Sequence, residues 1–174
     1  MNTAVRLFAE RVFDSVTVED VAAAAGVSPR TFFRYFDSKA GVVFGFAAVF
    51  HEGLQRALVE RPPGVSALAA FTEYWLREAQ VVYDHPETYR AQYELAARYA
   101  PVAAERSRVF DRTRSTMIEA LHAEAPRRAR VDVEMAASMM TDTIFTTLRV
   151  WHEHGGDPRR IFRDCMRVVE RAAG

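Results

Sequence analysis

Apolar residues recur every three or four positions along the chain, and no stretch alternates strictly between apolar and polar residues as a half-buried strand does. The spacing predicts a long helix that begins after Lys39 and ends at the Arg61-Pro62-Pro63-Gly64 segment. Further helices are predicted at residues 65–83, 86–98, 101–123, 132–154 and 158–172. With three helices expected before Lys39, the pattern predicts an all-α protein of about nine helices.

Two short helices joined by a glycine are predicted near the N-terminus. The Thr17 hydroxyl can cap the first helix, and Asp20 can return a hydrogen bond to the Thr17 backbone in a capping box. A buried stripe is expected on this helix at Val18, Val21, Ala22 and Ala25. Gly26 suits the left-handed backbone of a turn, and Val27 is expected to enter the small core.

The second short helix has Ser28 as its cap and Pro29 at its first helical position, and it is expected to run to about Phe36. In a helix-turn-helix the start of the second helix enters the major groove, where an arginine can pair with guanine or with phosphate. Phe32 and Phe36 are expected to face the core. The residues predicted to face DNA are Thr17, Ser28, Pro29, Arg30, Thr31, Phe33, Arg34, Tyr35 and Lys39.

This segment resembles the DNA-binding domain of the TetR/AcrR-type one-component transcriptional regulators. The resemblance covers residues 4 to about 45 and includes Leu7-Phe8, Phe13, Thr17-Val18, Asp20-Val21-Ala22, Ala25-Gly26-Val27-Ser28, Thr31-Phe32-Phe33, Tyr35-Phe36 and Ser38-Lys39. Val12 stands where the family usually has glycine, so the end of the first helix is expected to be remodelled. Phe33 replaces a tyrosine, which removes one phosphate contact. The chain begins almost inside the first helix, so contacts from a basic arm are not expected.

The resemblance implies a three-helix DNA-binding domain at residues 1–45 and a helical-bundle domain for effector binding and dimerisation at residues 46–174. The last two predicted helices are apolar on more than one side, which favours a four-helix interface with a second copy and a palindromic operator. The dimer contacts predicted there are Met140, Ile144, Leu148, Trp151, Phe162, Met166 and Val169. The alternative is that these residues pack only inside one chain.

The middle helices are rich in aromatic residues and methionines and carry few charges there, which is typical of a cavity for an apolar small molecule. The predicted lining residues are Phe71, Trp75, Ala79, Tyr83, Tyr93, Phe110, Arg114, Met117, Met139 and Thr143. For any single one of these residues, ordinary core packing or surface exposure explains the pattern equally well. The expected effector is a fatty-acyl or aromatic molecule, and no cofactor is predicted.

The net charge and the composition limit the possible functions further. The net charge is zero, with 23 basic and 23 acidic residues, so DNA binding is expected to depend on a few placed cations. The single cysteine, Cys165, is expected to pack in the core. No membrane span is expected, and the predicted location is the cytoplasm. The histidines are scattered, and no phosphate-binding loop or nucleophile motif occurs, so neither an enzyme nor a metal site is predicted.

Two functions from different classes fit these observations. The first is a dimeric repressor that binds a palindromic operator and is released by a small apolar effector. The second is a helical protein that binds a small molecule or a partner and whose DNA-binding head is weakened, which the neutral charge and the short N-terminus favour. Binding to an operator separates the two.

Overall fold

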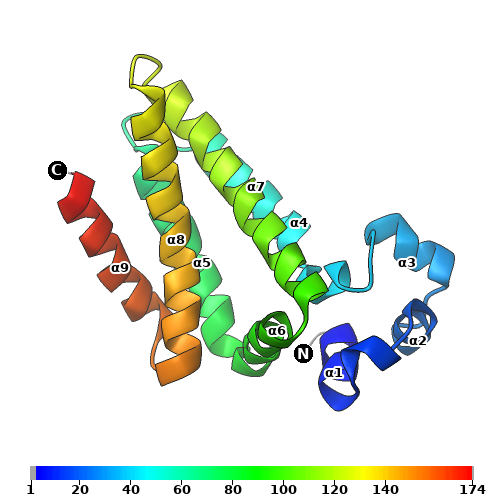
Figure 1. Ribbon diagram of the computed structural model, residues 1–174. Coiled ribbons are helices and arrows are strands. Elements are labelled where there is room, and N and C mark those ends of the chain that lie inside the picture. The colour runs from blue at the N-terminus through cyan, green and yellow to red at the C-terminus, as the bar shows by residue number, and fades with distance from the viewer. Residues whose placement is uncertain (1–2, 174) are drawn as a thin grey trace. The chain divides into compact units, whose positions relative to one another are not determined.

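The computed structural model describes residues 3–173, which form nine α-helices and two 3-10 helices and contain no strand (Figure 1). The elements are α1 (Thr3–Glu10), η1 (Phe13–Ser15), α2 (Val18–Ala24), α3 (Pro29–Tyr35), η2 (Gly41–Phe44), α4 (Ala47–Val59), α5 (Ala67–Asp84), α6 (Pro86–Arg98), α7 (Ala100–Glu124), α8 (Arg130–His154) and α9 (Pro158–Ala173). The predicted all-α fold is confirmed, and most helix ends lie within two residues of the predicted positions.

The chain forms two packing units. Unit 1 comprises Met1–Ala48 and His85–Val109, and unit 2 comprises Val49–Asp84 and Phe110–Gly174. Unit 1 thus includes α6 and the beginning of α7 as well as α1 to α3. The division into functional domains after residue 45 remains a prediction.

The core of unit 1 joins the N-terminal helices to α6 and α7. α1 packs against α2, α6 and η2. The Phe13 ring lies 4.9 Å from the Phe8 ring and 5.0 Å from the Tyr99 ring, measured between centroids. The buried Gln92 side chain on α6 donates a hydrogen bond of 2.7 Å to the Val43 carbonyl. The short N-terminal helices therefore have a core that residues much later in the chain complete.

The core of unit 2 is an aromatic cluster between helices. α8 and α9 form an antiparallel pair, and α9 also packs against α5 (Figure 1). The fully buried Phe162 ring on α9 lies 6.3 Å from the Phe71 ring and 5.9 Å from the Trp75 ring, both on α5. The Trp75 ring is also 6.0 Å from the Phe50 ring on α4. These rings hold α4, α5 and α9 together.

Gly53 on α4 lies against Tyr74 on α5. A Cβ atom at Gly53 would lie 2.5 Å from Tyr74 Oη and 3.0 Å from Tyr74 Cε2. Tyr74 is buried, and its hydroxyl donates a 2.8 Å hydrogen bond to the Phe50 carbonyl, so the ring has little freedom to move.

We expect Gly53→Ala to lower the free energy of unfolding by about 1–2 kcal/mol, because overpacking a core outweighs the gain in helix propensity. Urea denaturation followed by circular dichroism measures the change. In the Tyr74→Phe background, which lacks the clashing hydroxyl, the same substitution should cost less. An equal loss in both backgrounds would contradict the clash as its cause.

One segment of the described residues, Gly41–Val59, is apolar and long enough to cross a membrane, judged by length and composition alone. No membrane span is expected from the sequence, and this segment contains Glu52 and Arg56. The segment is divided in the structure, since η2 ends at Phe44 and α4 begins at Ala47. Core helices of soluble proteins pass the same test, so the segment carries no membrane assignment.

Candidate functional site

The start of α2 has the hydrogen bonds that its sequence predicts. Thr17 Oγ1 accepts a 3.1 Å hydrogen bond from the Asp20 backbone, and the Thr17 backbone donates to Asp20 Oδ2 at 2.9 Å. The bond from the Thr17 backbone stabilises the carboxylate and holds the pKa of Asp20 below its ordinary value. Gly26 follows α2 with φ of +70°, so the predicted capping box and left-handed turn are both confirmed.

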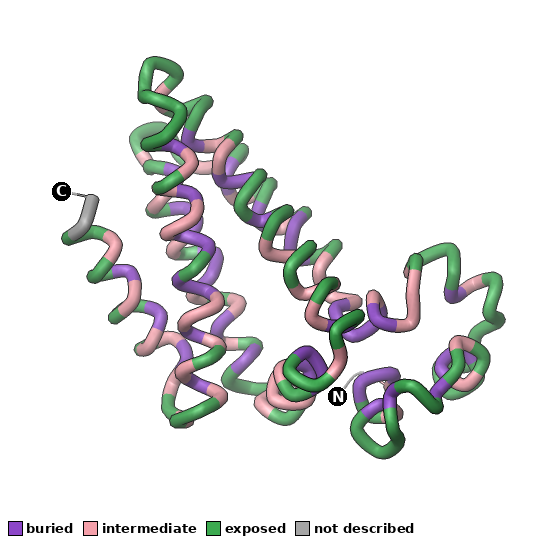
Figure 2. Tube along the Cα trace, viewed as in Figure 1, coloured by how far each residue is buried: buried purple, intermediate pink, exposed green. Residues whose placement is uncertain are grey.

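α3 is anchored on one side and exposed on the other. Ser28 Oγ accepts a 3.1 Å hydrogen bond from the Thr31 backbone, and Pro29 occupies the first helical position. The buried Phe32 ring lies 5.4 Å from the Phe36 ring, which packs against the core of unit 1. Thr31 is half-buried, and the exposed residues of this segment (Figure 2) are Ser28, Pro29, Arg30, Phe33, Arg34 and Tyr35.

The two arginines of α3 differ in how they are held. Arg34 donates a 3.1 Å hydrogen bond to the Tyr35 hydroxyl, and its guanidinium carbon lies 4.8 Å from the centre of the Tyr35 ring. Arg30 is exposed and has no hydrogen bond or ion pair within residues 3–173. Its planar guanidinium is therefore available to a guanine edge or a phosphate.

Lys39 is engaged inside unit 1. Its ammonium donates hydrogen bonds of 2.7 Å to the carbonyls of Phe13 and Val16, and it lies 4.3 Å from the centre of the Phe13 ring. Two of the three N–H groups of Lys39 are directed at backbone carbonyls, which leaves one for a phosphate, and the contact of Lys39 with DNA stays a prediction. Lys39 fixes η1 and the residue that follows it.

Two residues around the turn lie elsewhere than expected. Ala25 is exposed, and Val27 is 40% exposed instead of filling the core. The buried face of α2 is limited to Val21 and Ala22, with Val18 partly buried. The expected remodelling near Val12 is confirmed, since α1 ends at Glu10 and Val12 has an extended backbone before η1.

Two capped short helices joined by a left-handed glycine, with a buried first helix face and exposed arginines on the second helix, define a helix-turn-helix protein. Residues 1–45 match the family described as "Bacterial regulatory proteins, tetR family". Over 69 residues the chain is 39% identical to the HTH-type transcriptional regulator TcmR of Streptomyces glaucescens. That match covers 40% of this chain and 30% of TcmR, less than a third of the relative.

Solved structures share the fold over nearly the whole chain. Thermus thermophilus FadR, a TetR family transcriptional repressor in complex with lauroyl-CoA, is 20% identical, with a TM-score of 0.63 over 97% of this chain and 90% of that chain. A TetR transcriptional regulator from Rhodococcus sp. RHA1 is 22% identical, with a TM-score of 0.59 over the same shares of the two chains. Residues 1–45 are thus similar to the DNA-binding domain of TetR family regulators, and the chain has the all-helical fold of these structures.

The predicted ligand residues are not all in one place. Those buried in unit 2 are Phe71, Trp75, Ala79, Met117 and Thr143, while Phe110 and Met139 are half-buried. Arg114 is exposed and pairs with Asp111 at 2.7 Å, and Tyr83 is 49% exposed under the Arg159 guanidinium. These two assignments are corrected, because charged and amphipathic side chains on the outer faces of helices remain in water. Tyr93 belongs to unit 1.

Most buried polar side chains in the described part of unit 2 have hydrogen-bond partners, and the Trp75 indole is an exception. His51 Nε2 and Thr113 Oγ1 form a buried hydrogen bond of 3.1 Å. Trp75 is only 5% exposed, and its Nε1–H has no hydrogen-bond partner in the part of the chain that the structure describes. A buried donor without a partner costs about 1–3 kcal/mol. From the sequence, Trp75 is predicted only to line an apolar cavity. No sequence pattern shows whether its indole N–H has a hydrogen-bond partner.

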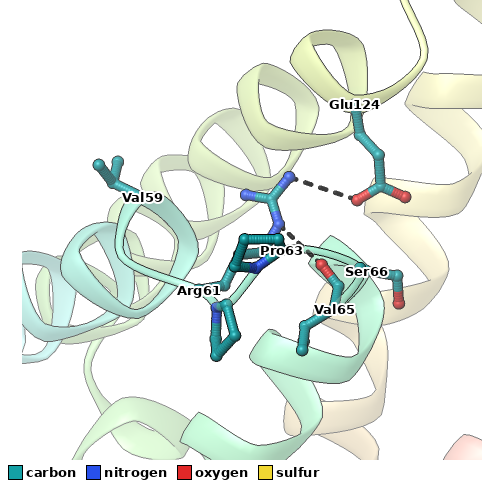
Figure 3. A pocket seen from close by; sticks show the side chains of 8 residues that line it. Val59, Arg61, Pro63, Val65, Ser66 and Glu124 are labelled. Atoms are coloured by element: carbon teal, nitrogen blue, oxygen red, sulfur yellow. Dashed lines mark hydrogen bonds and ion pairs between the residues drawn. The ribbon is translucent and has the colours of Figure 1, made fainter.

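A hollow of about 520 Å³ lies at the loop between α4 and α5 (Figure 3). Its lining residues are Val59, Arg61, Pro62, Pro63, Gly64, Val65, Ser66 and Glu124. Arg61 donates to the Val65 carbonyl at 3.1 Å and pairs with Glu124 at 3.4 Å, and Glu124 also accepts from the Ala67 backbone at 2.6 Å. These charges fasten the loop to the end of α7, and none of the predicted ligand residues lines the hollow.

Five of the seven predicted dimer contacts are buried within the single chain. They are Met140, Ile144, Trp151, Phe162 and Met166. Their assignment is corrected, because side chains that fill the core of one chain are not available to a second copy. Leu148 and Val169 are half-buried, and the exposed apolar residues of α8 and α9 are Val131, Met135 and Val168. Cys165 is half-buried, with the Thr147 hydroxyl 3.9 Å from its sulfur.

Proposed function

We propose that this protein is a TetR-type repressor that binds a palindromic operator as a homodimer and is released by a small apolar effector. The observation that carries the proposal is the two-sided construction of α3. Phe32 anchors one side in the core, while Arg30 is exposed and unpaired on the other. Because Ser28 and the buried face hold α3 in place, its reading face is organised before DNA arrives. We propose that the protein acts in the cytoplasm.

The effector is proposed to be a fatty-acyl or aromatic molecule held by unit 2. The buried aromatic and sulfur-containing side chains of α5 and α7, among them Phe71, Trp75 and Met117, support this class. The acyl-CoA bound in the FadR structure supports trying acyl compounds first. Ligand binding would weaken DNA binding only if the released and bound forms differ in their affinity for the ligand.

The homodimer is proposed to use the outer faces of α8 and α9. The exposed Val131, Met135 and Val168 lie on these helices and are more available than the five buried residues. A twofold dimer presents two copies of α3 to the two halves of an operator, which is why a palindromic site is expected.

A second candidate is a helical protein that binds a small molecule or partner and whose DNA head is weakened. One observation favours it: Lys39 is engaged with backbone carbonyls and Arg34 with Tyr35, which leaves few cations for phosphates. Phosphate neutralisation supplies much of the affinity for DNA, so a head with few free cations binds weakly.

Titration against labelled DNA from immediately upstream of the gene separates the two candidates. Fluorescence anisotropy at two salt concentrations, with unrelated DNA as competitor, measures affinity and specificity. Binding that resists the competitor and saturates at one or two dimers per site supports the repressor. Binding no tighter than to unrelated DNA supports the second candidate.

Arg30→Ala should weaken operator binding by about 1–3 kcal/mol, roughly 5- to 150-fold in Kd, and relax the preference at one base pair. The reason is loss of a bidentate contact to guanine, which no other part of α3 replaces. Anisotropy titrations against a set of single-base variants of the operator measure both effects. Arg128→Ala, which removes the same charge from an exposed site in unit 2, is the matched control. Equal losses in the two variants would exclude Arg30 from base reading.

A further inference from the structure

The indole N–H of Trp75 is a buried donor with no acceptor. The residue is 5% exposed, and no hydrogen-bond partner for Nε1 occurs among the described residues. Buried polar groups in proteins are almost always hydrogen-bonded, so each exception needs a physical explanation. The other tryptophan, Trp151 on α8, is also buried but has an interaction partner. The Trp75 indole on α5 is therefore the donor that needs such an explanation.

The rings that pack against Trp75 are apolar, and several buried threonine hydroxyls of unit 2 are already engaged within their own helices. Phe50 and Phe162 meet the indole edge to face, at interplanar angles of 80° and 63°. The hydroxyls of Thr116, Thr141 and Thr143 each donate to a backbone carbonyl of their own helix. A ligand that enters this core thus finds one uncommitted N–H among surfaces suited to apolar groups.

The charges of the buried side chains in unit 2 limit which hydrogen-bond acceptor the Trp75 N–H can bind. The buried polar residues of unit 2 in the described chain are His51, Thr113, Thr116, Thr141, Thr143 and Thr147. This set contains neither arginine nor lysine, and Glu78 follows Trp75 by three residues, one turn along the same side of α5. A carboxylate or phosphate buried here would have His51 as its one potential cationic partner in this set, whereas a neutral carbonyl oxygen requires no counterion.

We propose that the Trp75 Nε1–H recognises the effector by donating a hydrogen bond to it. The effector is accordingly an apolar molecule with an uncharged carbonyl oxygen, as in a ketone, ester or thioester. The inference rests on the proposed function, because it assumes that unit 2 binds the effector. It identifies Trp75 Nε1 as the atom that recognises the effector and a carbonyl as the group that the effector must carry. Pure hydrocarbons are therefore excluded as effectors.

Two probes of matched shape test the donor directly. Acetophenone carries a carbonyl oxygen, and isopropylbenzene has a methyl group in its place. The full chain is labelled with ¹⁵N at the tryptophan indoles, so a proton–nitrogen spectrum contains one indole signal for each of the two tryptophans. In the Trp151→Phe variant the Trp75 signal is the one indole signal that remains, so this variant assigns it without altering Trp75. Acetophenone is expected to move this signal downfield, as hydrogen bonding does, and isopropylbenzene is not.

Affinities for the two probes give a second readout. Acetophenone should bind roughly threefold to tenfold more tightly than isopropylbenzene to the wild type and to Trp151→Phe, because one hydrogen bond distinguishes the probes. Trp75→Phe should bind both probes equally. A preference for acetophenone that survives in Trp75→Phe would overturn the proposal, and so would an indole signal that acetophenone leaves unmoved at its solubility limit. A lasting cross-peak to water at Trp75 would identify water as the partner and overturn it too.

Operator binding, measured on the same samples, tests the proposed function independently of the Trp75 donor. Specific operator binding together with an unmoved Trp75 signal would reject the donor and leave the repressor standing. A moved Trp75 signal without operator binding would support the donor and favour the second candidate function. If the Trp75→Phe variant does not fold, the spectra of the wild type and of Trp151→Phe still decide the question.

Discussion

Phe162→Ala is expected to lower the free energy of unfolding by about 3–5 kcal/mol, the loss found when a buried phenylalanine is truncated. Phe162 is fully buried, and its ring is close to Phe71 and Trp75, both on α5. Truncation removes apolar surface from the core and leaves a cavity between α5 and α9, which the helices can close only in part. A loss of this size is a large share of the stability of a domain.

Urea denaturation at several protein concentrations, combined with sedimentation of the folded protein, measures this effect. A core role predicts lower stability at every concentration and an unchanged association state of the folded chains. Val168→Ala changes an exposed apolar residue on the same helix and should cost little stability. If Phe162→Ala instead gave stable chains that no longer associate, Phe162 would belong to the dimer interface as its sequence pattern predicts.

The difference between a core role and a dimer-interface role for Phe162 shows what the sequence pattern does not predict. Helical periodicity correctly places Phe162 and Met166 on an apolar face of the last helix, but it does not say which element covers that face. In the structure α5 and α8 lie against α9 and bury both residues within the chain. The information that decides the matter is the packing of segments far apart in sequence, which no local pattern contains.

Helix ends and caps, in contrast, are predicted well because their causes are local. The Thr17 capping box, the Ser28 cap and the left-handed Gly26 each depend on residues within four positions, and all are present in the structure. Most of the exposed face of α3 follows from the same local pattern. The unpaired Trp75 N–H does not, because an orphaned donor is defined by what surrounds it in three dimensions.

The position of Lys39 follows from the local pattern, but its contacts are with residues distant in the sequence. Its substitution is the second change with a large expected effect. Its position after α3 agrees with a phosphate contact, yet its ammonium donates to the carbonyls of Phe13 and Val16. Lys39→Met keeps the apolar stem and removes two charge-assisted hydrogen bonds. We expect a loss of about 2–4 kcal/mol in the stability of unit 1, because such bonds are stronger than neutral ones and the Val16 carbonyl is left without this donor.

Hydrogen exchange of the amides in unit 1, together with operator titrations at several salt concentrations, distinguishes a structural role from a phosphate contact. The structural role predicts faster exchange around η1 and an unchanged salt slope for the protein that remains folded. A lost phosphate contact predicts normal exchange and a salt slope reduced by about one. Arg30→Met, at an exposed and unpaired position of the same unit, supplies the opposite control: weaker DNA binding with unchanged exchange. Normal exchange in Lys39→Met would restore Lys39 to the DNA-binding surface, since the two carbonyls would then be shown not to depend on it.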